Sequence, residues 1–141
     1  IGRGKLKDTY LESIKRLNLL DRVKLYDWTD NISQYLNLAS LLVCPSRHEP
    51  FGNVVVDGWS HKIPVVVSDT GGPGKLIKNR INGLKFESEN SFELAEQIQT
   101  VIDEVNLRKK IVKNGYMDFQ NNFSEEVIVN KYIKFFRKIT K

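Results

Sequence analysis

Residues 41–74 read LLVCPSRHEPFGNVVVDGWSHKIPVVVSDTGGPG. Within this stretch, two short apolar runs at 41–44 and 65–67 are each followed by a polar loop that contains glycine. A continuous apolar run bounded by turn residues is typical of a strand that is covered on both faces. We therefore expect both runs to be central strands of one parallel sheet.

Helical and extended patterns alternate on either side of these two runs. Apolar residues recur at helical spacing over 5–17, a short alternating strand is expected at 23–26, and a second helix at 32–38. An Asn-Gly turn signal precedes one more short strand at 84–86. Strands that alternate with helices predict an α/β fold with a Rossmann-like parallel sheet and helices on both faces. In such a fold, ligands bind at the carboxyl ends of the strands.

Three further helices are predicted near the end of the chain. Asn90 and Glu93 resemble a capping box for the first, the second covers 107–119, and Ser124 can cap the third. This C-terminal helix, 124–141, has an apolar face that we expect to pack on the core: Ile128, Tyr132, Phe135, Phe136 and Ile139. The face opposite to it is basic: Lys131, Lys134, Arg137, Lys138 and Lys141. The alternative is a helix that lies on a membrane surface.

Composition restricts the classes of protein to which the chain can belong. Of the 141 residues, 40% are hydrophobic and 28% are charged, which is ordinary for a globular domain, and no apolar run is long enough to span a membrane. Residues 1–5 lack the apolar segment of a signal peptide. The single cysteine, Cys44, lies in an apolar run, so we expect a buried thiol in a cytoplasmic protein. The net charge of +5 suits nucleic acid, an anionic membrane or a phosphorylated small molecule, and does not choose among them.

The loop after the first apolar run contains a candidate anion site. Residues 53–61 include three consecutive valines, which favour a strand, but the glycine and asparagine at the start suit the entry turn of a helix. We predict a helix over 53–61 with Asn53 as its cap. The free N–H groups of Gly52, Asn53 and Val54 would then point out of the positive end of the helix dipole, where a diphosphate binds well.

Two carboxylates, those of Glu49 and Asp57, flank this helix end and lie eight residues apart. Carboxylates accept hydrogen bonds from sugar hydroxyls, whereas backbone amides hold phosphates. A nucleotide sugar offers both kinds of group, so the pattern suits this class of ligand.

The stretch from Pro45 onward resembles the signature of the retaining GT-B glycosyltransferases of the family 4 type. That signature is roughly P-S-x-x-E-x-F-G-x-x-x-x-E-A-x-A-x-G-x-P-V-V-x-S/T-x-x-G-G, and its two acidic residues form the E-x7-E motif. Glu49 and Asp57 hold those two places here, although Asp57 replaces the usual glutamate. Residues 82–84 match a later N-G-L segment of the family. The resemblance covers essentially the whole chain and implies the C-terminal half of a GT-B fold.

The resemblance also implies roles for individual residues. Glu49 would be the catalytic residue, because it would bind donor-sugar hydroxyls and stabilise positive charge at the anomeric carbon. Asp57 would accept hydrogen bonds from the ribose hydroxyls. The backbone amides of Phe51, Gly52 and Asn53 would bind the sugar and the diphosphate.

A further loop, formed by Trp28, Thr29 and Asp30, would lie against the nucleobase. Family enzymes bind the donor without a metal, so we expect neither a metal nor a cofactor, and the donor substrate is expected to be a UDP- or GDP-sugar.

The function implied by the resemblance is a hexosyltransferase-type reaction that proceeds with retention. The acceptor would be a glycan or a lipid-linked molecule of bacterial surface polysaccharide or lipopolysaccharide biosynthesis, bound by a separate N-terminal domain. We expect residues 1–141 to be a single nucleotide-sugar-binding domain, a fragment that lacks the first strand and helix of that domain and is inactive alone. We also expect the enzyme to be cytoplasmic, or alternatively to lie peripherally at the inner face of the membrane. We do not expect it to bind nucleic acid. Two alternatives remain open, a nucleotide-sugar epimerase of GT-B architecture and a non-catalytic basic binding module.

Overall fold

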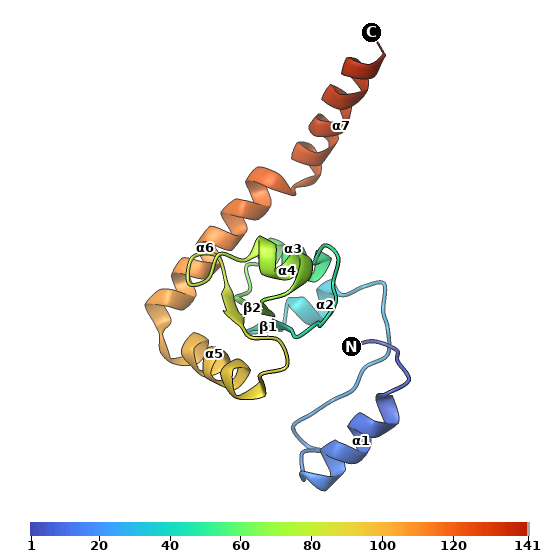
Figure 1. Cartoon of the computed structure of the whole chain (residues 1–141), viewed down its shortest axis with the longest axis vertical. Coiled ribbons are helices and arrows are strands. Elements are labelled where there is room, and N and C mark those ends of the chain that lie inside the picture. Colours follow the sequence, from blue (N-terminus) through green and yellow to red (C-terminus); the bar gives the residue numbers. More distant parts are fainter. Residues whose placement is uncertain (141) are drawn as a thin grey trace. The chain divides into compact units, whose positions relative to one another are not determined.

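The structure is a computed structural model that describes residues 1–140. Its chain forms two compact units, Ile1–Gln34 and Tyr35–Lys141. The first unit contains helix α1 (Lys7–Arg16), which lies within the predicted helix at 5–17. The second unit contains the sheet and the helices that cover it (Figure 1).

Three parallel strands form the sheet: β1 (Leu42–Cys44), β2 (Val65–Ser68) and β3 (Leu84–Phe86). Their order is β1-β2-β3, and Cys44 of β1 pairs with Val67 of β2. The predicted parallel pairing of the two apolar runs is therefore confirmed. The expectation that both runs are central is wrong for 41–44, since β1 is an edge strand of the described sheet. β3 pairs with β2 on the other side, so β2 alone is central.

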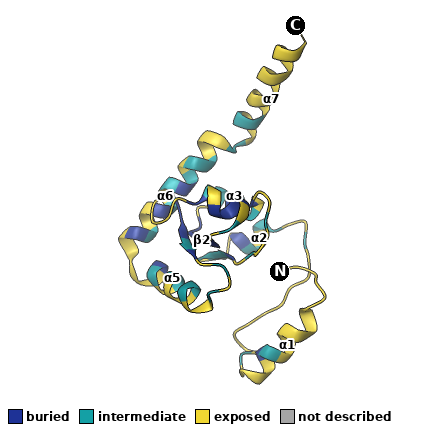
Figure 2. Ribbon diagram, in the orientation of Figure 1, coloured by how far each residue is buried: buried dark blue, intermediate teal, exposed yellow. Residues whose placement is uncertain are grey.

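Side chains of β2 alternate between two hydrophobic clusters, one on each face of the sheet. Val65 and Val67 pack with Trp59 of α3 (Asn53–Ser60), whereas Val66 packs with Val101 of α5 (Ser91–Asp103) and Ile111 of α6 (Val105–Asn122). All three valines are fully buried, and β2 has the colour of buried residues in Figure 2. Burial stabilises the fold by about 1.5–3 kcal/mol for each such side chain. The prediction of helices on both faces is confirmed.

The helix α3 forms in spite of its three consecutive valines, as predicted for 53–61. Val55 is completely buried against the sheet, so tertiary packing outweighs the preference of valine for a strand. Two helices differ from expectation. The helix α2 (Ser33–Leu36) is shorter than the predicted 32–38, and α4 (Gly71–Leu76) was not predicted because its sequence contains three glycines and a proline.

The strand expected at 23–26 is not formed, since these residues belong to no strand of the described structure. A strand needs a neighbour to complete its backbone hydrogen bonds. Among residues 1–140, no strand pairs with this segment, although the N–H of Gly2 donates to the C=O of Tyr26 at 2.9 Å.

The predicted helix caps are present only in part. The N–H of Glu93 donates to Asn90 Oδ1 at 3.0 Å, but the Glu93 carboxylate accepts from the N–H of Glu87 instead of completing a capping box. Ser124 is the N-cap residue of α7 (Glu125–Ile139), but its hydroxyl donates backward to the C=O of Gln120. Ser124 therefore does not cap α7 through its side chain.

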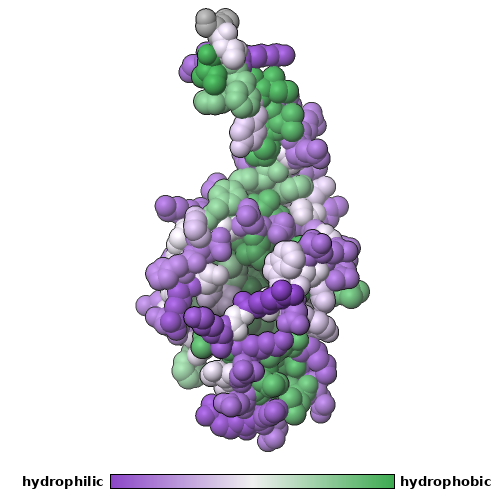
Figure 3. All heavy atoms as spheres, turned by 90° about the vertical axis from the view of Figure 1, so that its right-hand side faces the viewer, coloured by the Kyte–Doolittle hydropathy of each residue, from purple (hydrophilic) through white to green (hydrophobic). Residues whose placement is uncertain are grey.

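Helix α7 contains no buried residue, so the expectation that its apolar face packs on the core is wrong. Tyr132, Phe135, Phe136 and Ile139 are each more than half exposed, and hydrophobic side chains are visible on this part of the surface (Figure 3). The reason is that α3, α5 and α6 already cover the sheet, while α7 follows α6 and makes its main contacts with that helix. No helix in residues 1–140 is long and apolar enough to cross a membrane.

Candidate functional site

The two polar loops predicted to carry function lie side by side. Because β1 and β2 are parallel neighbours, the loops that follow Cys44 and Ser68 start at the same edge of the sheet. The hydroxyls of Ser68 and Thr70 both donate to the C=O of Ser46, at 2.6 and 3.0 Å. The loop after β2 is therefore hydrogen-bonded to the beginning of the loop after β1.

Glu49 is half-buried and is held through both its main chain and its side chain. Its C=O accepts the N–H of Gly72 at 2.8 Å, and its Oε1 accepts the N–H of Gly52 at 3.1 Å. The N–H of Gly52 is consequently not free in this structure, contrary to expectation. A carboxylate already occupies one of the positions at which an anion would bind.

The N-terminal end of α3 follows directly. Gly52 is the N-cap residue, in the left-handed conformation with φ 95°, and Asn53 is the first residue of the helix, so the prediction of Asn53 as the cap is wrong by one position. Gly52 has no side chain with which to cap the helix, and the Glu49 carboxylate binds only its N–H. The N–H groups of Asn53 and Val54 have no acceptor within the helix, which leaves them available to a ligand. The side chain of Phe51 beside them is 48% exposed and lies edge-to-face against Phe123, at 6.0 Å between ring centroids.

Asp57 lies one turn further along α3 and is half-buried. Burial raises the pKa of its carboxyl group, and the charge of His61 opposes this in part. The His61 ring approaches the backbone C=O of Asp57, at 2.8 Å from Nδ1, and does not neutralise the carboxylate through a hydrogen bond. An ionised carboxylate that is partly desolvated in this way is disposed to accept hydrogen bonds from the hydroxyl groups of a ligand.

The remaining predicted residues, Trp28, Thr29 and Asp30, belong to the first unit. The hydroxyl of Thr29 accepts the N–H of Asn31 at 3.1 Å, and Trp28 is 62% exposed. The structure thus groups Glu49, Phe51, Gly52, Asn53 and Asp57 along one loop and helix, while a role of residues 28–30 at the nucleobase stays a prediction.

Sequence reasoning missed the contact of residues 71–73 with this loop. A Cβ atom added to Gly71 would lie 2.3 Å from the C=O oxygen of Glu49, and one added to Gly72 would lie 2.1 Å from that of Phe51. The ring of Pro73 lies against Gly52. Two adjacent glycines directly after a buried strand were the available signal, but the sequence does not say which backbone they approach.

Cavities are also present outside this loop. One, of about 590 Å³, is open at the carboxyl ends of β2 and β3 and is lined by Asp69, Thr70, Asn79, Lys85, Phe86, Glu87, Ser88 and Glu93. Within it, Lys85 and Asp69 form an ion pair at 2.9 Å.

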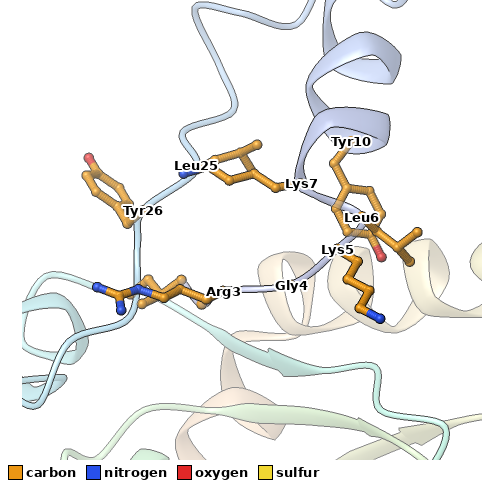
Figure 4. A pocket seen from close by; sticks show the side chains of 10 residues that line it. Arg3, Gly4, Lys5, Leu6, Lys7, Tyr10, Leu25 and Tyr26 are labelled. Carbon is orange, nitrogen blue, oxygen red and sulfur yellow. The ribbon is translucent and has the colours of Figure 1, made fainter.

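Another cavity, of about 420 Å³, lies within the first unit, between the N-terminal segment and residues 25–26 (Figure 4). The Nζ of Lys7, which lines it, donates to Asp27 at 2.7 Å, and this contact lowers the pKa of Asp27. No predicted site residue lines this cavity.

Proteins of known family share this fold. The chain is 27% identical over 134 residues to the lipopolysaccharide core biosynthesis glycosyltransferase LpsE of Rhizobium meliloti, which covers 95% of this chain and 39% of that protein. It is 33% identical to an uncharacterized glycosyltransferase of Methanocaldococcus jannaschii, over 99% of this chain and 40% of that one. The chain thus spans about two fifths of the length of these relatives.

Among solved structures, Anabaena HepE in complex with UDP superimposes with a TM-score of 0.87 at 27% identity, over 93% of this chain and 36% of that one. The parallel sheet with its surrounding helices is accordingly the Rossmann-like C-terminal domain of GT-B glycosyltransferases, part of a larger fold. The model of the family described as glycosyl transferases group 1 matches residues 1–118. This chain belongs to the glycosyl transferases group 1 family.

Proposed function

We propose that this chain is the donor-binding part of an enzyme that transfers a sugar, with retention, from a UDP- or GDP-sugar to a glycan or lipid-linked acceptor. The observation that carries the proposal is the arrangement of the Glu49 carboxylate, the N-terminal end of α3 and Asp57 along one loop and helix. Anabaena HepE has been solved with UDP and with UDP-glucose, which supports a nucleotide-sugar donor. The name of LpsE supports a role in lipopolysaccharide biosynthesis.

In this proposal each group meets a different part of the donor. The N–H groups at the start of α3 bind the diphosphate, since they carry the positive end of the helix dipole. Asp57 accepts hydrogen bonds from the ribose hydroxyls. Glu49 binds the donor sugar near its anomeric carbon, where positive charge develops in the transition state. Trp28, Thr29 and Asp30 contact the nucleobase, and the reaction uses neither a metal nor a cofactor.

The acceptor is proposed to bind to a separate N-terminal domain. The relatives are more than twice as long as this chain, which supports a two-domain enzyme. A hexose as the transferred sugar, a cytoplasmic location and a peripheral contact with the membrane belong to the same proposal.

Isothermal titration calorimetry of the full-length protein with UDP and with GDP tests the proposal. We expect one of the two nucleotides to bind, Asp57→Asn to weaken that binding, and the affinity to change only modestly with salt. Retention is tested by the anomeric configuration of the product. Equal failure of UDP and GDP to bind, or binding of nucleic acid whose affinity falls steeply with salt, would contradict the proposal and favour a basic binding module.

A further inference from the structure

We propose that Gly72, together with its neighbours Gly71 and Pro73, is a positioning residue for the candidate catalytic Glu49. We call residues 71–73 the glycine clamp. The inference rests on the proposed function, because it assigns to these residues the task of fixing the Glu49 carboxylate at the anion-binding end of α3.

The first step of the argument is a hydrogen bond to the main chain of Glu49. The buried Gly72 donates its N–H to the Glu49 C=O at 2.8 Å. Because Glu49 Oε1 in turn accepts the N–H of Gly52 at 3.1 Å, Glu49 is hydrogen-bonded through both its main chain and its side chain. Loss of the Gly72 contact frees the backbone from which the carboxylate extends.

The second step is the close approach of the two backbones. A Cβ atom on Gly72 would lie 2.1 Å from the C=O oxygen and 2.4 Å from the Cα of Phe51, far inside van der Waals contact with main-chain atoms. Gly71 meets the Glu49 C=O in the same way, and its φ of 55° further disfavours a side chain. Any side chain here therefore displaces residues 49–51 by about 1 Å, a misplacement that can reduce catalysis about a hundredfold.

The third step is the contact that completes the clamp. Gly52 has φ 95°, and the Pro73 ring lies where a Cβ atom of Gly52 would make contact at 3.0 Å. Consecutive residues 71–73 thus lie on successive parts of the loop 49–52. These contacts fix the loop that carries both the carboxylate and the first amides of α3, which a purely packing role would not require.

A double-mutant cycle in the full-length protein tests this inference, with UDP as the probe. Since Glu49 shares the Gly52 N–H with an incoming diphosphate, Glu49→Gln is expected to tighten UDP binding severalfold. Gly72→Ala is expected to weaken it about tenfold, because the displaced loop misplaces one amide that would bind the diphosphate, and this loss outweighs the release of the carboxylate. In the Gly72→Ala background, Glu49→Gln should no longer change the affinity, because the carboxylate has already left the amide.

Gly115→Ala is the matched control. A Cβ on Gly115 would lie 2.4 Å from Cδ1 of Trp59, a clash of similar severity that does not involve residues 49–52. This variant should lower Tm, yet keep the full effect of Glu49→Gln. If Gly72→Ala does not fold, Pro73→Ala removes part of the clamp without adding atoms and should reduce the effect in the same direction.

Amide hydrogen exchange separates this inference from the proposed function. Gly72→Ala should accelerate exchange at the Gly52 N–H without any ligand present, whereas Gly115→Ala should not. An unchanged Gly52 exchange rate, or a Glu49→Gln effect that is the same with and without Gly72, would overturn the positioning role. Absence of UDP and GDP binding in the wild type would instead count against the proposed function, while the exchange result still decides on the clamp.

Discussion

The carboxylate of Glu49 accepts the backbone N–H of Gly52, three residues further along the same loop, at 3.1 Å. This bond places a negative charge at the positive end of α3, where the diphosphate of the donor is proposed to bind. The same side chain is proposed to contact the donor sugar. Because a carboxylate has two oxygens, Glu49 can keep the Gly52 amide on Oε1 and contact the donor sugar through Oε2.

Glu49→Gln should lose far more turnover than Asp57→Asn in the full-length enzyme. Glu49 is proposed to act where charge develops, so its loss raises the barrier of the chemical step. Asp57 is proposed to contact the ribose, so its loss appears mainly as weaker donor binding. Steady-state kinetics that resolve kcat from KM measure the difference. A larger loss of kcat for Asp57→Asn at saturating donor would show that the roles are exchanged.

Asp57→Asn should stabilise the fold at neutral pH while it weakens donor binding. Burial raises the pKa of the Asp57 carboxyl above its ordinary value of 3.8, so the folded protein disfavours the charged form. The destabilising effect is therefore absent at low pH, where the group is protonated in both states, and appears as pH rises through the raised pKa. Removing the charge should increase the free energy of unfolding at pH 7.

Urea unfolding at several pH values measures this effect. The advantage of Asp57→Asn should shrink as the pH falls from 7 toward about 4. Asp69→Asn is a useful comparison, since Asp69 is exposed and pairs with Lys85. A loss of stability for Asp57→Asn at pH 7 would mean that the carboxylate is held by the fold and is not kept available for a ligand.

Asn82→Ala should destabilise the protein by about 3 kcal/mol. The Asn82 side chain is buried, and it accepts the N–H of Lys78 at 2.7 Å and donates to Asp118 at 2.7 Å. Its truncation removes both of these part-buried hydrogen bonds. Asn79→Ala removes one exposed bond, to the N–H of Lys85, and should cost only about 1 kcal/mol. Thermal unfolding of the two variants compares them, and equal shifts in Tm would contradict the proposed importance of burial.

Phe135→Ala and Phe136→Ala should each change the stability of the 141-residue chain by no more than about 0.5 kcal/mol. Both rings lie on the exposed face of α7 and are more than half accessible to solvent. Phe86→Ala, at a ring that is 3% exposed in the core, should cost about 3–5 kcal/mol. A large loss for the α7 variants in this chain would show that the apolar face is covered in solution, for example by a second copy.

The 141-residue chain alone is not expected to transfer sugar. It spans about two fifths of its relatives, and acceptor binding is proposed to require a separate domain. We expect binding of UDP or GDP in the millimolar range at best, seen as chemical-shift changes around Gly52, Asn53 and Asp57. Measurable turnover of any nucleotide sugar onto an acceptor by this chain would disprove the expectation.

Local patterns predicted most of the fold, because apolar runs, turn residues and helical spacing are properties of short segments. The parallel strands β1 and β2 and the helix α3 follow from them. The failures at 23–26 and at Ile128, Tyr132, Phe135, Phe136 and Ile139 share one cause. A pattern indicates that a face is apolar, but whether a neighbouring strand or helix covers it depends on the rest of the structure.

The candidate site, like the fold, was predicted only as far as neighbouring residues in the sequence indicate it. The residues on one loop and helix, from Glu49 to Asp57, could be named because they are close in sequence. The bond from the N–H of Gly72 to the C=O of Glu49 could not, since it joins backbones 23 residues apart and involves no side chain. Main-chain contacts of this kind leave only a requirement for glycine in the sequence.

The exposure of α7 has a consequence for the cooperativity of unfolding. A helix of 15 residues without a buried side chain gains little from tertiary packing, and isolated helices of about that length are only marginally stable in water. Helix α7 should therefore melt separately from the sheet, over a broad and lower temperature range. Circular dichroism in the far ultraviolet would then report helix loss before the near-ultraviolet signal of the buried Trp59 changes, so the chain would not unfold in a single two-state transition.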